Sequence, residues 1–178
     1  VNLSPLQFRQ SDVIAVLDRL TKDYAIDPAH FVLEITEGVL MDAGERTRES
    51  LEGIRSRGFR MALDDFGTGY SSLAYLCTFQ FDKIKIDRSF VAGLSRSANF
   101  RTIVQSVISL GSGLGMQVVA EGVETEIEAQ SMTALGCTQM QGYFFARPMP
   151  RPALEAFLKD YAPSVRTTGV PARIAAAS

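Results

Sequence analysis

The chain is best understood from one stretch, Met61-Ala-Leu-Asp-Asp-Phe-Gly-Thr-Gly-Tyr-Ser-Ser72. An apolar run of strand length, residues 59–63, ends directly before Asp64 and Asp65, and small and polar residues then mark a loop. Two adjacent carboxylates repel each other and are costly to bury unless a divalent cation lies between them. Oxygen ligands of this kind suit Mg²⁺ or Mn²⁺. A solvated turn is the alternative explanation, because Asp and Gly both favour turns.

The composition is that of an ordinary soluble globular domain. The 178 residues are 46% hydrophobic and 21% charged, and the net charge is −2. This charge gives no basis for binding DNA or RNA, which usually requires a basic face. No apolar run reaches the length of about 20 residues that a membrane helix needs, so we expect a cytoplasmic segment without membrane contact. Cys77, Cys137 and the single histidine, His30, fit no zinc-site spacing.

Strand-like and helical patterns alternate along the chain. The alternation occurs six times, at intervals of roughly 20 to 30 residues, which is the size of a βα unit. Strands are expected at residues 1–3, 31–36, 59–63, 82–87, 116–120 and 138–143, and helices at residues 13–24, 43–57, 70–77, 98–113, 124–135 and 150–161. The pattern predicts parallel strands with helices packed outside them. Both a barrel and an open doubly wound sheet satisfy it.

Polar residues at the strand ends favour the barrel. They are Asn2, Glu34, Asp64 with Asp65, Lys85 with Asp87, Glu121 and Gln141. A (β/α)₈ barrel builds its active site from the C-terminal ends of several strands, whereas an open sheet gathers its ligand at one switch point. We therefore predict a TIM-like (β/α)₈ barrel over residues 1–161, represented by about six βα units whose missing first strands precede Val1. Residues 162–178 lack a periodic apolar pattern and are expected to form a disordered tail.

Each of these polar residues also has a simpler structural explanation. Glu34 lies among apolar neighbours, so it must be metal-bound, protonated or paired with a barrel lysine. Lys85 is expected to bind phosphate or polarise a water, or to pair with a neighbouring acid. Glu121 precedes Gly122, which suggests a tight turn next to a site. A turn without any functional role would explain this glycine equally well. Asn2 and Gln141 are neutral, and buried hydrogen bonds are the alternative role for both.

With these residues in order, the sequence closely resembles the EAL family of bacterial cyclic di-GMP phosphodiesterases. The matching segments follow the family order and extend over the chain to about residue 150. They are Val1-Asn-Leu-Ser4, Leu33-Glu-Ile-Thr-Glu37, Leu63-Asp-Asp-Phe-Gly-Thr-Gly-Tyr-Ser-Ser72, Ile84-Lys-Ile-Asp-Arg-Ser-Phe90, Val119-Ala-Glu-Gly-Val-Glu124 and Met140-Gln-Gly-Tyr-Phe144. One such motif would be weak evidence for the family, but six motifs in the family order are specific evidence.

The resemblance implies an enzyme that hydrolyses one phosphodiester of cyclic di-GMP to give linear pGpG, with two Mg²⁺ or Mn²⁺ ions as cofactors. Carried over by motif, Asn2, Glu34 and Asp64 resemble ligands of the first ion. Asp64 would also bind the second ion, together with Asp65. Glu121 would be a further metal ligand.

The resemblance also implies roles outside the metal ligands. Lys85 and Glu121 look like the residues that hold and activate the attacking water, with Glu121 as the base. Gln141 resembles a residue that closes the site over the substrate, which Lys85 would also contact. Glu37 resembles the glutamate that steadies the loop over residues 66–72. In the family this loop is tied to dimer contacts and to control of activity, so a homodimer and an upstream regulatory or GGDEF-type domain are expected partners beside cyclic di-GMP.

The main departure from the family is that the Glu-Ala-Leu signature itself is absent. In the family it belongs to the first barrel strand, which would precede Val1, and its glutamate ligates the first metal. We expect little turnover if the polypeptide begins at Val1, and an active enzyme if a parent protein supplies the missing part. The alternative is a receptor-type domain that binds cyclic di-GMP or a partner protein without cleavage. A barrel enzyme of another class is a weaker reading, because no other cofactor motif is visible.

Overall fold

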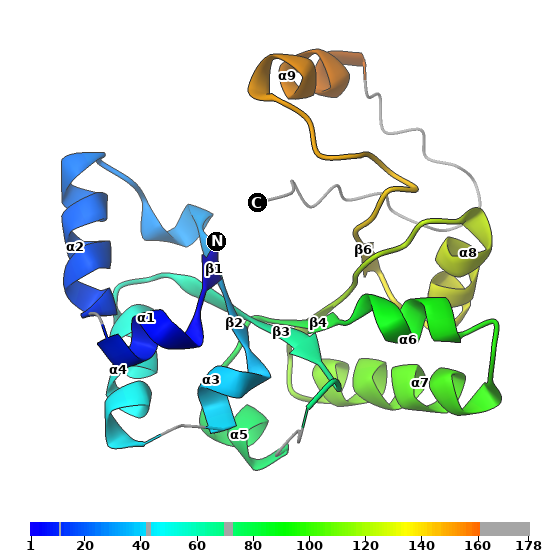
Figure 1. Cartoon of the computed structure of the whole chain (residues 1–178), viewed down its shortest axis with the longest axis horizontal. Coiled ribbons are helices and arrows are strands. Elements are labelled where there is room, and N and C mark those ends of the chain that lie inside the picture. The colour runs from blue at the N-terminus through cyan, green and yellow to red at the C-terminus, as the bar shows by residue number, and fades with distance from the viewer. Residues whose placement is uncertain (11, 42–43, 70–72, 161–178) are drawn as a thin grey trace.

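The computed structural model describes residues 1–10, 12–41, 44–69 and 73–160 (Figure 1). Within these ranges, six strands form one parallel sheet in the order β1-β2-β3-β4-β5-β6. The strands are β1 (Asn2–Leu3), β2 (Val32–Thr36), β3 (Arg60–Phe66), β4 (Lys83–Ile86), β5 (Gln117–Ala120) and β6 (Gln139–Met140). The predicted tail at residues 162–178 and the predicted domain boundary at residue 161 lie outside the described residues.

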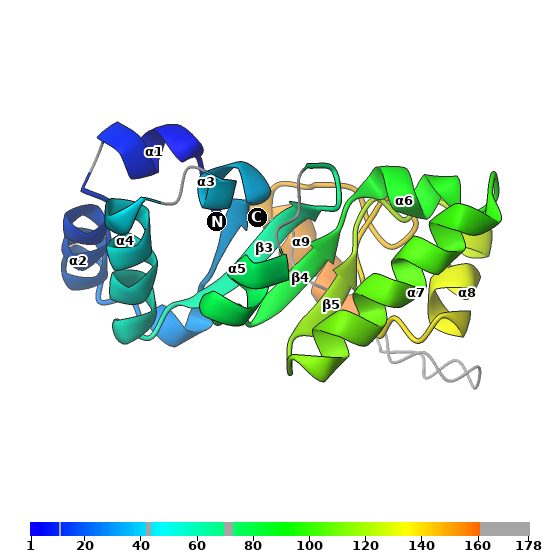
Figure 2. The same cartoon turned by 90° about the horizontal axis from the view of Figure 1, so that it is seen from below.

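Helices connect the strands, because parallel neighbours require crossover connections. They are α1 (Pro5–Gln10), α2 (Val13–Asp23), the 3₁₀-helix η1 (Pro28–His30), α3 (Glu37–Met41), α4 (Glu45–Ser56), α5 (Leu73–Thr78), α6 (Arg88–Gly93), α7 (Ala98–Gly113), α8 (Glu126–Ala134) and α9 (Arg151–Asp160). The short helices α1, α3 and α6 follow the C-terminal ends of β1, β2 and β4 and lie along one edge of the sheet (Figure 2). These three helices are absent from the elements predicted above, because five or six residues are too few to show a helical apolar pattern.

The strand order confirms the predicted TIM-like α/β architecture. In a TIM-like barrel, consecutive parallel strands are neighbours, whereas a doubly wound sheet reverses its order at a switch point. Across the described residues the order runs from β1 to β6 without such a reversal. The C-terminal ends of all six strands therefore follow one another along a single edge.

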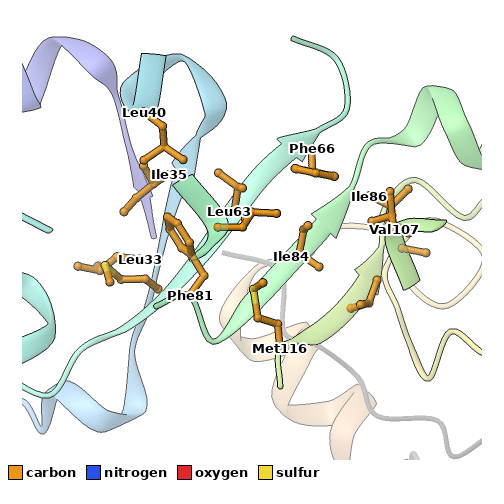
Figure 3. Close-up of a cluster of buried hydrophobic side chains, with 14 of the residues drawn as sticks. Leu33, Ile35, Leu40, Leu63, Phe66, Phe81, Ile84, Ile86, Val107 and Met116 are labelled. Carbon is orange, nitrogen blue, oxygen red and sulfur yellow. The ribbon is translucent and has the colours of Figure 1, made fainter. Parts of the chain in front are cut away.

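Alternation along the strands gives the sheet two chemically different faces. Paired residues on neighbouring strands share a face, so Asn2 lies beside Glu34 and Lys83 lies beside Gln117 on the polar face. The other face and its helices form the hydrophobic core (Figure 3). This core includes Leu33, Ile35, Leu63, Ile84, Ile86, Val107 and Met116. The polar face is therefore the one that can contact ligands, and the hydrophobic core packs against the opposite face of the same strands.

Strand β3 is longer than predicted and contains an irregularity at its end. It continues past Leu63 to Phe66, and its register with β4 shifts between these two residues. Asp65 there has a φ of 54°, a left-handed conformation that Asp adopts more readily than most residues. Because of the extra residue, Leu63 and Phe66 both enter the core and Asp64 and Asp65 are kept out of it.

The helices are distributed over both sides of the sheet. α5 and α7 lie on one side, and α9 lies on the opposite side (Figures 1 and 2). In the part of the chain that the structure describes, no helix has both the length and the apolar character that crossing a membrane would take.

Candidate metal centre

Lys85 lies at the centre of a buried cluster of carboxylates on the polar face. Its Nζ is 2.9 Å from Oε2 of Glu34, 3.0 Å from Oδ1 of Asp64 and 2.7 Å from Oε1 of Glu121. These residues come from β2, β3, β4 and the position directly after β5. The parallel order of the strands brings together side chains that are up to 87 positions apart in the sequence, from 34 to 121.

The ammonium group of Lys85 balances part of this negative charge. Its side chain is only 7% exposed, and burial alone would lower its pKa. The hydrogen bonds that it donates to Glu121 and Glu34 outweigh burial, so the pKa of Lys85 is raised above its ordinary value. Lys85 is therefore protonated at neutral pH, but one ammonium group cannot neutralise all the carboxylates around it.

Asp65 adds a further carboxylate to the cluster. One carboxylate oxygen each from Asp64, Asp65 and Glu121 lie within 4.8 Å of one another. Burial and then repulsion by Asp64 raise the pKa of Asp65. Burial also raises the pKa of Glu121, despite the hydrogen bond from Lys85. The carboxyl groups of Glu34, Asp64, Asp65 and Glu121 thus gather close to the single ammonium group of Lys85.

The donor set fits a hard divalent cation. Mg²⁺ binds oxygen ligands at about 2.1 Å in octahedral geometry, so neighbouring ligand oxygens lie about 3 to 4 Å apart. Carboxylate oxygens already within 4.8 Å of one another need only small side-chain movements to reach that spacing. Carboxylates suit Mg²⁺ and Mn²⁺, whereas zinc prefers the histidine and cysteine ligands that this cluster does not use.

Glu34 and Asn2 border this group of carboxylates. Glu34 forms the ion pair with Lys85 that the sequence analysis named as the alternative to a metal ligand. Asn2 pairs with Glu34 in the sheet register, so their side chains share the polar face, and Asn2 is exposed to solvent. The roles of both residues as metal ligands stay predictions.

Gln141 lies at the same edge of the sheet as Glu121. It follows β6 directly and is half-buried. Its backbone N–H donates to the carbonyl of Ala120 at 2.8 Å, and its carbonyl accepts from the N–H of Val123 at 3.1 Å. The backbones that carry Gln141 and Glu121 are therefore bonded to each other.

Glu37 lies outside the cluster and contacts the loop that follows β3. It is the first residue of α3 and is buried. Its Oε1 accepts from the N–H of Gly67 at 3.3 Å, and its Oε2 accepts from the N–H of Gly69 at 3.0 Å. The ring of Phe90 lies so close to Gly67 that an added Cβ would be 2.9 Å from it. Residues 70–72 of the predicted loop lie outside the described residues.

Sequence reasoning missed two features around the site. Lys85 could pair with Asp87 or with a neighbouring glutamate, and it pairs with Glu34 and Glu121. Asp87 caps α6, where its Oδ1 accepts from the N–H of Ser89 at 2.9 Å. Lys83 precedes Lys85 by two residues in β4, so it lies on the same face, and it donates to Oε1 of Gln139 at 3.3 Å. Gln139 precedes Gln141 by two residues, so the period of two along a strand is the signal that could have identified it.

Known proteins are similar to this chain in sequence and in fold. MucR of Pseudomonas aeruginosa, a bifunctional diguanylate cyclase/cyclic di-GMP phosphodiesterase, is 38% identical over 156 residues, which are 88% of this chain and 23% of that protein. The solved structure of the PaMucR phosphodiesterase with c-di-GMP has a TM-score of 0.82 at 38% identity, covering 86% of this chain and 62% of that chain. The chain thus spans about a quarter of the length of its relative MucR.

A second solved structure holds a metal ion. BlrP1 of Klebsiella pneumoniae, in a manganese/cy-diGMP complex at pH 9.0, has a TM-score of 0.77 at 36% identity, covering 83% of this chain and 38% of that chain. The family profile described as "EAL domain" matches residues 1–148, which include every strand of the sheet and all the residues of the carboxylate cluster. The fold, the cluster and the profile agree, and the chain belongs to the EAL domain family.

Proposed function

We propose that this chain forms the metal-binding and catalytic part of a phosphodiesterase that hydrolyses cyclic di-GMP to linear pGpG. The observation that carries the proposal is the convergence of Glu34, Asp64, Asp65 and Glu121 around Lys85. The named activity of MucR and the c-di-GMP and manganese complexes of related structures support the choice of substrate and cofactor.

Two Mg²⁺ or Mn²⁺ ions are the proposed cofactors. Asn2, Glu34 and Asp64 would hold the first ion, and Asp64 with Asp65 would hold the second, with Glu121 beside them. Such cations, when bound, neutralise phosphate charge and acidify water. This also accounts for how a chain with a net charge of −2 binds a dianionic dinucleotide.

The chain's own residues supply the proton transfer and the positioning. Glu121 accepts a proton from the water whose oxygen attacks phosphorus, and burial, which raises its pKa, makes it a better base. The phosphorus–oxygen bond to the 3′ oxygen breaks and that oxygen takes up a proton from solvent, while Glu121 later returns the proton it accepted to solvent. Lys85, 2.7 Å from Glu121, orients the base and stabilises the negative charge that develops on the phosphoryl oxygens.

Gln141 and Glu37 act at the border of the site. We assign Gln141, half-buried at the end of β6, to contact with the substrate, together with Lys85. Glu37 holds the backbone of the loop after β3 through its bonds to Gly67 and Gly69. A loop held in this way keeps the aspartate pair at the preceding strand end in a fixed orientation.

The partners of the whole protein are also part of the proposal. The name of MucR combines a diguanylate cyclase with a phosphodiesterase, and this chain spans 23% of its length. We therefore expect a longer polypeptide with an upstream regulatory or GGDEF-type domain, a homodimer, and a cytoplasmic location for this segment.

The direct test is hydrolysis of cyclic di-GMP by the chain, alone and within any longer polypeptide that contains it. In the longer polypeptide we expect pGpG to form with Mg²⁺ or Mn²⁺, and not in the presence of EDTA or in Asp64→Asn, whereas the chain alone should give little product. Asp18→Asn is the matched control, because Asp18 forms an exposed pair with Arg57. Tight binding of cyclic di-GMP without product would favour the receptor alternative, and neither binding nor product in the longer polypeptide would contradict both.

A further inference from the structure

The turn that carries Glu121 is packed so tightly that two glycines in and beside it have no room for a side chain. Gly122 has a φ of 65°, and a Cβ there would overlap the Cβ of Arg88 and lie 3.3 Å from its Cα. A Cβ on Gly142 would overlap the backbone nitrogen and carbonyl oxygen of Val123. The turn is thus enclosed between the start of α6 and the segment after β6.

Backbone hydrogen bonds hold the same turn on both sides. The N–H of Glu121 donates to the carbonyl of Ile86 at 3.0 Å, which ties the start of the turn to the end of β4. Val123 accepts from the N–H of Phe144 at 3.0 Å and donates to the carbonyl of Gln141 at 3.1 Å. Val123 is also fully buried. The backbone of the turn therefore has little freedom to shift.

We propose that Gly122 and Gly142 are positioning residues that fix the carboxylate of Glu121 within the cluster. The close contacts of Gly122 with Arg88 and of Gly142 with Val123 fix the distances of the turn from α6 and from the segment after β6. These two distances in turn determine the 2.7 Å contact between Glu121 and Lys85. Displacements of about 1 Å at an active site cost large factors in rate. The consequences for metal binding and catalysis rest on the proposed function, whereas the consequence for the ion pair with Lys85 does not.

The arrangement also couples two site residues. Gln141 immediately precedes Gly142, and its backbone is bonded to both ends of the Glu121 turn through Ala120 and Val123. A change that lifts the turn would therefore move Gln141 and Glu121 together. In the proposed enzyme, the residue that contacts the substrate and the base would lose their positions at the same time.

Gly115 and Gly136 provide matched controls for the test. They have φ values of 74° and 87°, close to that of Gly122, but a Cβ on either would meet nothing within 4 Å. Gly115→Ala, Gly136→Ala and Gly122→Ala thus impose the same kind of backbone strain. Only Gly122→Ala adds the collision with Arg88, so the difference between the variants isolates the packing of the turn.

The first readout is a double-mutant cycle for thermal unfolding of the chain in EDTA. If the turn positions Glu121 against Lys85, the shift in Tm caused by Glu121→Gln should shrink by about half or more in the Gly122→Ala background. The same shift should be unchanged in the Gly136→Ala background. This readout needs neither metal nor substrate, so it decides the positioning role even if the wild-type chain binds no metal and the proposed function fails.

The second readout is Mn²⁺ affinity, measured by calorimetry. Gly122→Ala and Gly142→Ala should weaken Mn²⁺ binding by about tenfold or more, as changes behind metal ligands typically do. Gly115→Ala and Gly136→Ala should retain the wild-type affinity. If the chain is an active phosphodiesterase, kcat should fall in the same two variants and not in the controls.

A rescue experiment guards against simple misfolding. Arg88→Gly removes the Cβ and Cγ that an alanine at position 122 would meet, so the double variant Arg88→Gly/Gly122→Ala should recover the wild-type response to Glu121→Gln. No such rescue exists for Gly142→Ala, because its collision is with the backbone of Val123. The proposal is overturned if Gly122→Ala behaves like Gly136→Ala, or if Arg88→Gly fails to restore the response.

Discussion

The ammonium group of Lys85 is the internal counter-ion of the site. It contacts carboxylates carried by β2, by β3 and by the residue directly after β5, and its side chain is only 7% exposed. Removing one partner of a buried ionic cluster leaves charges that are neither solvated nor paired. In the chain without metal, the stability of the site therefore depends on this one lysine.

Substituting Lys85→Met tests this role. In EDTA, the free energy of unfolding should fall by about 3 to 5 kcal/mol, because the carboxylates lose their cation. Mn²⁺ should restore part of the loss. Urea denaturation with and without Mn²⁺ measures both effects, with Lys22→Met on the exposed face of α2 as the control. Unchanged stability in Lys85→Met would contradict the counter-ion role.

The carboxyl group of Glu121 gives the metal-free chain a pH dependence. Burial raises its folded-state pKa above the ordinary value of 4.5, so the folded chain binds this proton more tightly than the unfolded chain. The resulting stability is fully present below pH 4.5 and is lost as the pH rises through the folded-state pKa.

The variant Glu121→Gln should therefore lack this loss of stability with rising pH. The difference in unfolding free energy between variant and wild type, measured in EDTA from about pH 4 to about pH 8, should move in favour of the variant as the pH rises. Glu49→Gln, on the exposed side of α4, should show a constant difference. A constant difference for Glu121→Gln as well would contradict the raised pKa.

At the scale of elements, α3 and the loop after β3 form one unit through Glu37. The two hydrogen bonds to Gly67 and Gly69 are made by a buried carboxylate, and such charge-assisted bonds contribute about 1.5 to 3 kcal/mol. The loop begins where β3 ends, so its order is linked to the orientation of Asp65.

The variant Glu37→Ala should loosen this loop. Amide hydrogen exchange at Gly67 and Gly69, followed by NMR, should accelerate about tenfold or more. The reason is that exchange requires local opening of the loop, and the loss of the two hydrogen bonds lowers the free energy of that opening. Exchange in β5, which does not pair with β3, should stay the same, and Glu49→Ala is the control. Unaltered exchange at the two glycines would show that other contacts hold the loop.

Most elements could be predicted from the sequence, and the failures have identifiable causes. β2 and β5 contain apolar runs, and β4 alternates lysine with isoleucine, so each shows a strand pattern. α7 is long enough to show a helical one. The irregularity that brings Asp64 and Asp65 to the polar side arises from the register between β3 and β4, which no local pattern reports. The close packing of Gly122 on Arg88 likewise exists only after folding.

At the scale of the whole molecule, the carboxylates belong to strands that are distant in sequence, so a cation that binds them links several βα units. Ligands that bind only the folded state stabilise it by mass action, by about 2.7 kcal/mol at 100 times the Kd. Mn²⁺ should therefore raise the Tm of the chain, and EDTA should reverse the rise.

The control for this prediction is Asp64→Asn, which removes the carboxylate shared by both proposed ions. Its Tm should not respond to Mn²⁺, whereas Asp18→Asn should respond as the wild type does. A rise of equal size in Asp64→Asn would mean that Mn²⁺ binds elsewhere on the chain.

The order of the strands and the place of the site could be predicted at this scale because parallel βα units leave few arrangements. The convergence of residues 34, 64, 85 and 121 follows from that topology once the strands are recognised. The sequence could not show that Lys85 contacts three carboxylates at once, because that depends on side-chain geometry inside the curved sheet.

The most direct test of the account is anomalous X-ray diffraction at the manganese edge from crystals of the chain grown with Mn²⁺. The account predicts a peak within bonding distance, about 2.2 Å, of carboxylate oxygens of Asp64 and Asp65, with Glu121 beside it. The peak should be absent from crystals of Asp64→Asn. Manganese found only at other positions, with these carboxylates still paired to Lys85, would contradict the metal centre on which the proposed function depends.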